Sequence, residues 1–204
     1  MTDLMDSSTG VEQTQADTVP ARATGWLLVI CGIAGLAAAA TLSIDEYRLL
    51  VSPGYQPSCN LSPFVSCGSV MASAQAKVFG FPNPYLGLPT FAVVIASGLL
   101  TTARVALPRW WWAGLTLGGL FGVGFVGWLI FQSLYRIDRL CPYCMVVWAV
   151  VPIILVTAFR QTTMGIGGIP RAIADWRWVV VAIYYSAVIL LVYLQFQDYW
   201  LSLI

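Results

Sequence analysis

The chain has 204 residues, of which 59% are hydrophobic and 9% charged, with ten Lys and Arg against nine Asp and Glu. A soluble domain carries about 25% charged residues, so this chain cannot cover a water-facing surface and its composition is typical of a membrane protein. The net charge of +1 gives no electrostatic basis for nucleic-acid binding. Histidine is absent from the sequence. Imidazole catalysis and imidazole metal ligation are therefore excluded, and five cysteines are the main reactive side chains.

The first 24 residues are polar and lack apolar periodicity, and we expect residues 1–24 to form a disordered cytoplasmic tail rather than a secretory signal. Five stretches then reach the length of about 20 apolar residues that a membrane span needs, without an interior charged residue. They are residues 25–44, 85–103, 110–135, 141–159 and 178–196. Backbone polar groups find no partners in lipid, so each stretch is predicted to be a helix. The predicted fold class is an all-α integral membrane protein.

Small residues and prolines mark particular spans. Gly114, Gly118 and Gly122 recur every four residues in the third span, and we expect this stripe to pack against a neighbouring helix rather than bind a ligand. Pro89 and Pro152 lie inside the second and fourth spans and are predicted to kink them.

The distribution of basic residues favours an N-terminus on the cytoplasmic side, because the inner segments then carry six Lys or Arg and the outer segments four. In this orientation the long segment 45–84 and the short segment 136–140 both lie outside. The pair Ser62-Pro63 has the pattern of an N-cap followed by a first-turn proline, which predicts a short helix running through Cys67.

Four of the five cysteines fall on this predicted outer side. Cys59 and Cys67 lie in PSCNLSPFVSC, and Cys141 and Cys144 form CPYC at the start of the fourth span. Residues three apart share a helix face, and free N–H groups at a helix N-terminus stabilise a thiolate. A redox-active CPYC pair is favoured over a stapling disulfide, since so short a loop constrains almost no unfolded chain.

Other interpretations of the cysteines stay open. The Cys59/Cys67 pair is equally compatible with a structural disulfide. Zinc binding by all four cysteines is conceivable, although the seven residues between Cys59 and Cys67 fit structural zinc spacing poorly. Cys31, alone in the first span, is expected to be a small apolar packing residue.

Two cysteine pairs on one membrane face suggest a thiol–disulfide relay that ends at an electron acceptor. The sequence has no nucleotide-binding Gly-rich loop, haem site or flavin motif, so a lipid-soluble quinone is the predicted acceptor. Trp148 lies one helical turn deeper than Cys144 and either walls a quinone ring or packs in the core. Tyr143 is expected to tune access to the pair.

Four elements in their order carry a family resemblance: a first span, CNLSPFVSCGSVMAS, FPNPYLG opening the second span, and CPYC opening the fourth. Over residues 25–160 the sequence resembles the vitamin K epoxide reductase family, specifically its bacterial disulfide-forming members. The resemblance implies a four-helix transmembrane bundle around a quinone, of menaquinone or ubiquinone type, with a fifth, peripheral transmembrane helix. The expected organisation is the tail, this catalytic bundle, and residues 161–204 with a cytoplasmic loop and the fifth span.

The resemblance also implies roles for particular residues. Cys59 would exchange with a thioredoxin-like extracytoplasmic partner, supplied separately because no fused thioredoxin-like domain is seen. Cys67 would pass electrons to Cys141, and Cys144 would reduce the quinone. The residues implied beside the quinone are Ser73, Asn83 and Trp148. The implied location is the bacterial cytoplasmic membrane, with the active site on the extracytoplasmic face.

Three mechanistic expectations follow. Cys144 is expected to leave as a thiolate held by the helix N-terminus. The loop 45–84 is expected to move in order to bring Cys67 to Cys141. The spans are expected to hold no carboxylates, which argues against a proton pathway. The alternatives are a vitamin K-type quinone or quinone-epoxide reductase and a non-catalytic scaffold stapled by disulfides.

Overall fold

The computed structural model describes residues 20–52, 54–60, 62, 64–164 and 169–197. The predicted tail falls almost wholly outside these residues. The described chain is helical apart from loops and one bridged residue pair, Val65 and Leu140. Its elements are α2 (Arg22–Val51), α3 (Cys67–Met71), η1 (Ala74–Lys77), α4 (Pro84–Thr102), α5 (Arg109–Gln132), η2 (Ser133–Ile137), α6 (Pro142–Thr163), α7 (Ile169–Asp175) and α8 (Arg177–Gln195).

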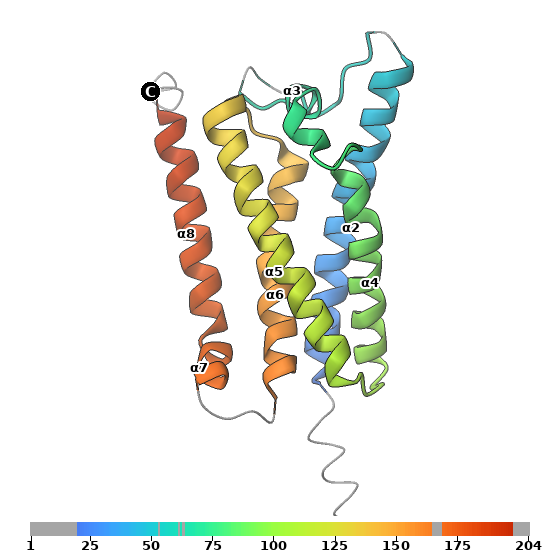
Figure 1. Ribbon diagram of the computed structural model, residues 1–204, viewed down its shortest axis with the longest axis vertical. Coiled ribbons are helices and arrows are strands. Elements are labelled where there is room, and N and C mark those ends of the chain that lie inside the picture. Colours follow the sequence, from blue (N-terminus) through green and yellow to red (C-terminus); the bar gives the residue numbers. More distant parts are fainter. Residues whose placement is uncertain (1–19, 53, 61, 63, 165–168, 198–204) are drawn as a thin grey trace, which may run out of the picture.

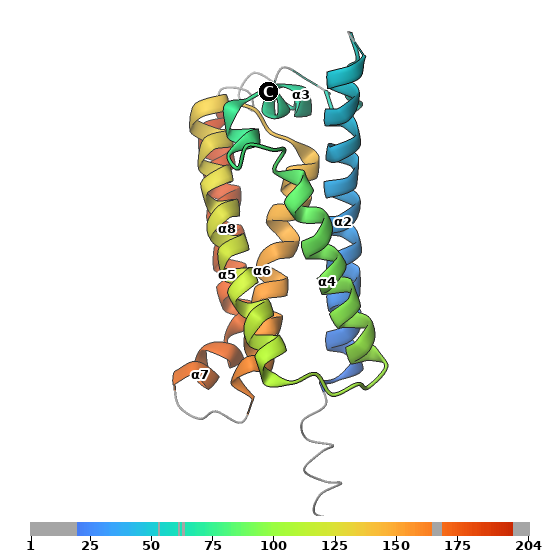
Figure 2. The ribbon, with the colours of Figure 1, turned by 45° about the vertical axis from the view of Figure 1, so that its right-hand side comes forward.

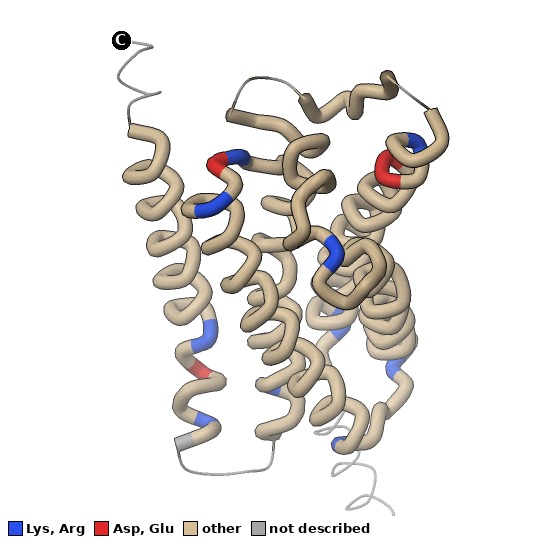
Figure 3. The backbone as a smooth tube through the Cα atoms, turned by 45° about the horizontal axis from the view of Figure 1, so that its top comes forward, with Lys and Arg blue, Asp and Glu red and all other residues tan. Residues whose placement is uncertain are grey.

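The five predicted spans are confirmed, because five helices of the described chain are long and apolar enough to cross a membrane. They are α2, α4, α5 with its π-helical continuation η2, α6 and α8. Charged residues gather towards the two ends of the bundle (Figure 3). This arrangement leaves an apolar middle that suits the lipid interior, as expected for a multi-pass membrane protein.

Four of these helices form the bundle and α8 stands to one side (Figure 1). α2 packs along α4 and also against α6, and α6 packs along α5. Seen from a second direction, α2 and α4 run together on one flank and α5 and α6 on the other (Figure 2). α3 and η1 cover one end of the bundle, here called the α3 end.

α2 and α4 approach each other closely at glycines of α2. A Cβ atom added to Gly25 or Gly35 would collide with Thr102 or with the ring of Phe91. The predicted packing of the α5 glycine stripe is wrong in part, because a Cβ on Gly114 or Gly118 would meet nothing within 4 Å in the described structure. Small residues predict a close approach but not which helix takes part.

Two local predictions also need correction. α2 runs seven residues past the predicted end of the first span, to Val51, and carries Asp45 and Glu46 into the buried interior. The predicted helix from Ser62 does not form; α3 begins at Cys67, with Ser66 as its N-cap. Ser62 instead closes a turn by accepting a hydrogen bond from Val65 N. Residues after this turn bridge to Leu140, which requires an extended backbone.

Candidate active site

Sulfur atoms from two distant parts of the chain meet at the α3 end of the bundle. Cys59 and Cys67 form a disulfide with a Cα–Cα distance of 5.7 Å. The Sγ atom of Cys67 lies 3.3 Å from that of Cys141, and both side chains are fully buried. Leu42 and Met71 enclose this cluster, with Tyr143 and Cys144 at its edge. The predicted gathering of four cysteines is thus present, and two of the four sulfurs are held in a disulfide rather than free to ligate zinc.

Backbone pairing holds Cys67 against Cys141. Leu140 N donates to Phe64 O at 2.8 Å, and Ser66 N donates to Leu140 O at 3.0 Å. Each cysteine directly follows one of these paired residues, so the pairing brings the two sulfurs together. The expected loop movement is therefore unnecessary for this contact, because the two sulfurs already touch.

A polar network fixes the start of α3. Asn60 Oδ1 accepts hydrogen bonds from Gly68 N and from Ser66 Oγ, each at 3.0 Å. Ser66 Oγ in turn accepts from Ser69 N at 3.3 Å, as an N-cap side chain does. Cys67 is the first residue of this capped helix, and hydrogen bonds to its neighbours Ser66 and Gly68 fix its backbone.

CPYC opens α6, as predicted. Cys141 is the N-cap, Pro142 follows at the first helical position, and Cys144 N donates to Cys141 Sγ at 3.4 Å. The hydrogen bond with Cys144 lowers the pKa of the Cys141 thiol, backbone N–H groups of Cys144 and Tyr143 lower it further, and burial and the charge of Asp45 oppose them. The helix N-terminus thus favours a thiolate on Cys141 in this reduced pair, and the expected Cys144 thiolate during exchange stays a prediction.

Two buried acids of α2 are absent from the predicted site, and the charge of one of them, Asp45, acts on Cys141. Asp45 Oδ1 accepts a hydrogen bond from the Tyr55 hydroxyl at 2.7 Å, while Oδ2 is buried without a hydrogen-bond partner in the described chain. Glu46 Oε1 lies 3.3 Å from Lys77 Nζ in η1. Both acids lie on α2 just beyond the predicted first span, residues 25–44, which itself holds no carboxylate. The signal for them in the sequence was their spacing. Asp45 and Glu46 follow Leu42 by three and four residues, so on one helix they share a face with Leu42, which packs against the sulfurs.

The residues predicted to line a quinone site occupy three places. Ser73 Oγ donates to Val70 O at 2.6 Å, and Asn83 Nδ2 donates to Gln75 O at 2.7 Å, so both bond within the loop. Tyr143 packs beside the sulfurs. Trp148 is buried in a neighbouring cluster that Cys144 also borders.

Two polar atoms in this set suit a ligand carbonyl or hydroxyl. Trp148 Nε1 and Asn83 Oδ1 are buried and have no hydrogen-bond partner among the described residues. An unmade buried hydrogen bond costs about 1–3 kcal/mol, so such atoms are good places for a ligand to bond. Of the two, Trp148 belongs to the cluster that Cys144 borders, so its indole N–H fits a ligand carbonyl near Cys144.

An apolar cleft of about 410 Å³ lies between α4 and α5. α4 and α5 pack mainly against α2 and α6 rather than against each other, and Val151 and Ile154 of α6 form the floor between them. The open glycines of α5 line one wall, facing Thr90, Phe91, Val93 and Val94 of α4. This cleft is where the α5 glycine stripe is exposed instead of packed.

A buried disulfide in contact with a cysteine of a C-x-x-C pair, at one end of a transmembrane helix bundle, defines a membrane protein of thiol redox chemistry. The sequence matches the family model described as the vitamin K epoxide reductase family over residues 26–159. The chain belongs to this family and is therefore a membrane oxidoreductase. Comparison with curated proteins gave no significant match.

Proposed function

We propose that this protein is a thiol:quinone oxidoreductase that re-oxidises a thioredoxin-like extracytoplasmic partner and so supports disulfide-bond formation. The observation that supports it most directly is the 3.3 Å contact between Cys67 and Cys141, which joins the two cysteine pairs into one chain of sulfurs. At this separation a thiolate on one pair is next to the disulfide sulfur of the other.

Electrons enter at the loop pair. A thiolate of the reduced partner attacks Cys59, forms a mixed disulfide and releases Cys67 as a thiolate. Cys67 then attacks Cys141 of the oxidised CPYC pair, and Cys144 is released. The partner's second thiol displaces Cys59 and leaves as an oxidised protein.

Cys59 next attacks Cys67 in the Cys67–Cys141 disulfide, which restores the loop disulfide and expels Cys141. A thiol of lower pKa is a better leaving group, and the hydrogen bond with Cys144 lowers the pKa of Cys141. The result is a loop disulfide beside a reduced CPYC pair, which matches the bonding described above. Two electrons have then moved from the partner to CPYC.

The acceptor is a quinone, which takes two electrons and two protons as the Cys141–Cys144 disulfide re-forms. Cys144 borders the cluster that holds Trp148, whose indole N–H has no partner among the described residues and suits a quinone carbonyl. We assign Asn83, Ser73 and Tyr143 to the same site as supporting residues. The apolar cleft between α4 and α5 suits an acceptor with a long hydrocarbon tail dissolved in lipid.

We also propose that the N-terminus is cytoplasmic and the α3 end extracytoplasmic, in a bacterial inner membrane. The excess of basic residues on the opposite end favours this orientation. Disulfides persist in extracytoplasmic compartments, which fits the Cys59–Cys67 bond.

The decisive experiment measures quinone reduction by the purified protein with a reduced thioredoxin-like donor. Cys144→Ser is expected to abolish turnover. Cys31→Ser is the matched control, because Cys31 is buried in the bundle core away from the other sulfurs. Full activity of Cys144→Ser would refute the proposal, and turnover of a quinone epoxide but not of the thioredoxin-like donor would favour the reductase alternative.

A further inference from the structure

Pro152 leaves α6 with a backbone carbonyl that its own helix cannot satisfy. A proline has no N–H, so the carbonyl four residues earlier, that of Trp148, loses its helical donor. The Tyr184 hydroxyl of α8 donates to Trp148 O at 3.3 Å, and the Tyr185 hydroxyl donates to the adjacent Ala149 O at 2.5 Å. Two neighbouring tyrosines of the fifth helix therefore bond the backbone one turn before Pro152.

The other end of α8 holds the loops beside the sulfurs. Gln195 Nε2 donates to Asp138 Oδ1 at 3.0 Å, in the segment that leads to CPYC. The Phe196 ring is buried and meets the Phe64 ring edge to face at 5.9 Å between centroids. Phe64 pairs with Leu140, the pairing that sets Cys67 against Cys141.

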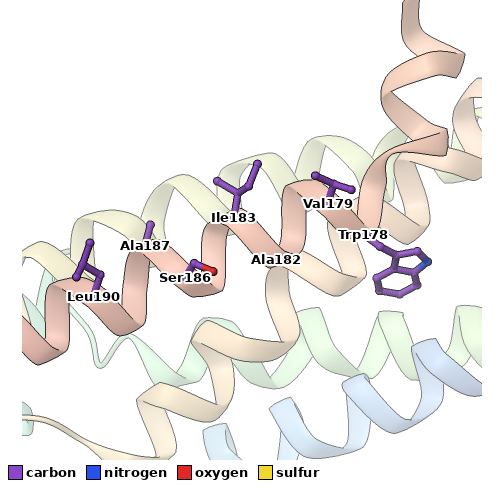
Figure 4. Close-up of a pocket in the computed structure, with 7 residues that line it drawn as sticks. All are labelled: Trp178, Val179, Ala182, Ile183, Ser186, Ala187 and Leu190. Atoms are coloured by element: carbon purple, nitrogen blue, oxygen red, sulfur yellow. The ribbon is translucent and has the colours of Figure 1, made fainter.

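These hydrogen bonds and the ring contact determine the position of α8, because few of its other side chains are buried. Among the described residues of the helix, full burial is confined to Val181. The opposite face carries a shallow apolar groove of about 620 Å³, suited to lipid and without a reactive side chain (Figure 4). Lipid removes the hydrophobic driving force between helices, so polar contacts and side-chain fit determine where such a helix sits.

We propose that α8 is a positioning element of the redox centre: Tyr184 and Tyr185 fix the part of α6 before Pro152 that carries Trp148, and Phe196 fixes the paired loops beside Cys67 and Cys141. The helix lies beyond the residues that match the family model. The functional part of this inference rests on the proposed quinone chemistry, because Trp148 and Cys144 are taken to face the acceptor.

The test compares Tyr184→Phe/Tyr185→Phe with Tyr193→Phe. Both changes keep the aromatic rings, and Tyr193 lies on the same helix but is 57% exposed. Hydrogen–deuterium exchange of α6 around Pro152 in nanodiscs reports the clamp without any substrate. Steady-state kinetics report KM for a short-chain quinone and for the thiol donor separately.

In the double variant we expect exchange around Pro152 to be at least threefold faster and KM for quinone at least threefold higher, with KM for the donor unchanged. Tyr193→Phe should leave all three values as in the native protein. Unchanged exchange in the double variant would overturn the clamp. Faster exchange with an unchanged quinone KM would overturn the positioning role and leave a purely structural one. If the native protein reduced no quinone, the proposed function would be refuted. The hydrogen–deuterium exchange measurement would then still test whether Tyr184 and Tyr185 hold α6.

Discussion

Removing Lys77 should cost more stability than removing Glu46, although the two side chains form one ion pair. Glu46 is 3% exposed and Lys77 is 43% exposed, with 3.3 Å between Nζ and Oε1. Lys77→Gln leaves a buried carboxylate without its cation, whereas Glu46→Gln removes the buried charge and leaves the lysine in contact with solvent. Breaking a fully buried pair from one side costs about 3–5 kcal/mol, and an exposed pair is worth about 0–1 kcal/mol. For this half-exposed pair we expect about 1–2 kcal/mol for Lys77→Gln and less than about 1 kcal/mol for Glu46→Gln.

Unfolding in mixed micelles with increasing fraction of denaturing detergent measures these differences. The free energy of unfolding of the double variant should be close to that of Glu46→Gln, since neither variant holds a buried carboxylate without its cation. Comparing the double variant with the two single variants isolates the interaction energy of the ion pair. Arg136→Gln, at an exposed site, is the matched control for loss of one positive charge. If Glu46→Gln cost as much as Lys77→Gln, the assignment of Glu46 as the desolvated partner would be wrong.

Two further predictions concern the Cys141 thiol and helix packing. The hydrogen bond with Cys144 lowers the pKa of Cys141, so alkylation of Cys141 in the reduced protein should reach half its limiting rate at a pH below that of an ordinary thiol. Cys144→Ala should move this midpoint upward; a native midpoint at or above the ordinary value would contradict the assignment. Gly35→Ala should destabilise the protein by about 1–3 kcal/mol because its Cβ meets the Phe91 ring, whereas Gly118→Ala in the open cleft should be neutral in the same detergent assay. Equal effects at the two glycines would contradict the packing described.

The membrane helices could be predicted from the sequence because length and apolarity are local properties. The start of α6 at CPYC could also be predicted, since a cysteine followed by proline suits the first residues of a helix. The end of α2 could not, because a search for uncharged stretches stops at Asp45 while the helix continues to Val51. The two buried acids were missed for this reason.

Contacts between distant segments account for the other differences. Ser62 and its following proline have a helix-start pattern, but pairing of residues 64–66 with Leu140 keeps that segment extended. Cysteine spacing predicted two pairs on one side, yet the direct contact between Cys67 and Cys141 depends on that same pairing. The tyrosines of α8 gave no local signal, because their partners are backbone carbonyls of another helix: that of Trp148, freed by Pro152, and that of the adjacent Ala149.

The relay depends on direct transfer between Cys67 and Cys141, and disulfide trapping tests it. In a protein carrying both Cys59→Ala and Cys144→Ala, the two remaining sulfurs have lost their own partners. With 3.3 Å between them, mild oxidation is expected to link Cys67 to Cys141 within one chain, while buried Cys31 stays unlinked as an internal control. Recovery of both Cys67 and Cys141 as free thiols after oxidation would contradict the relay.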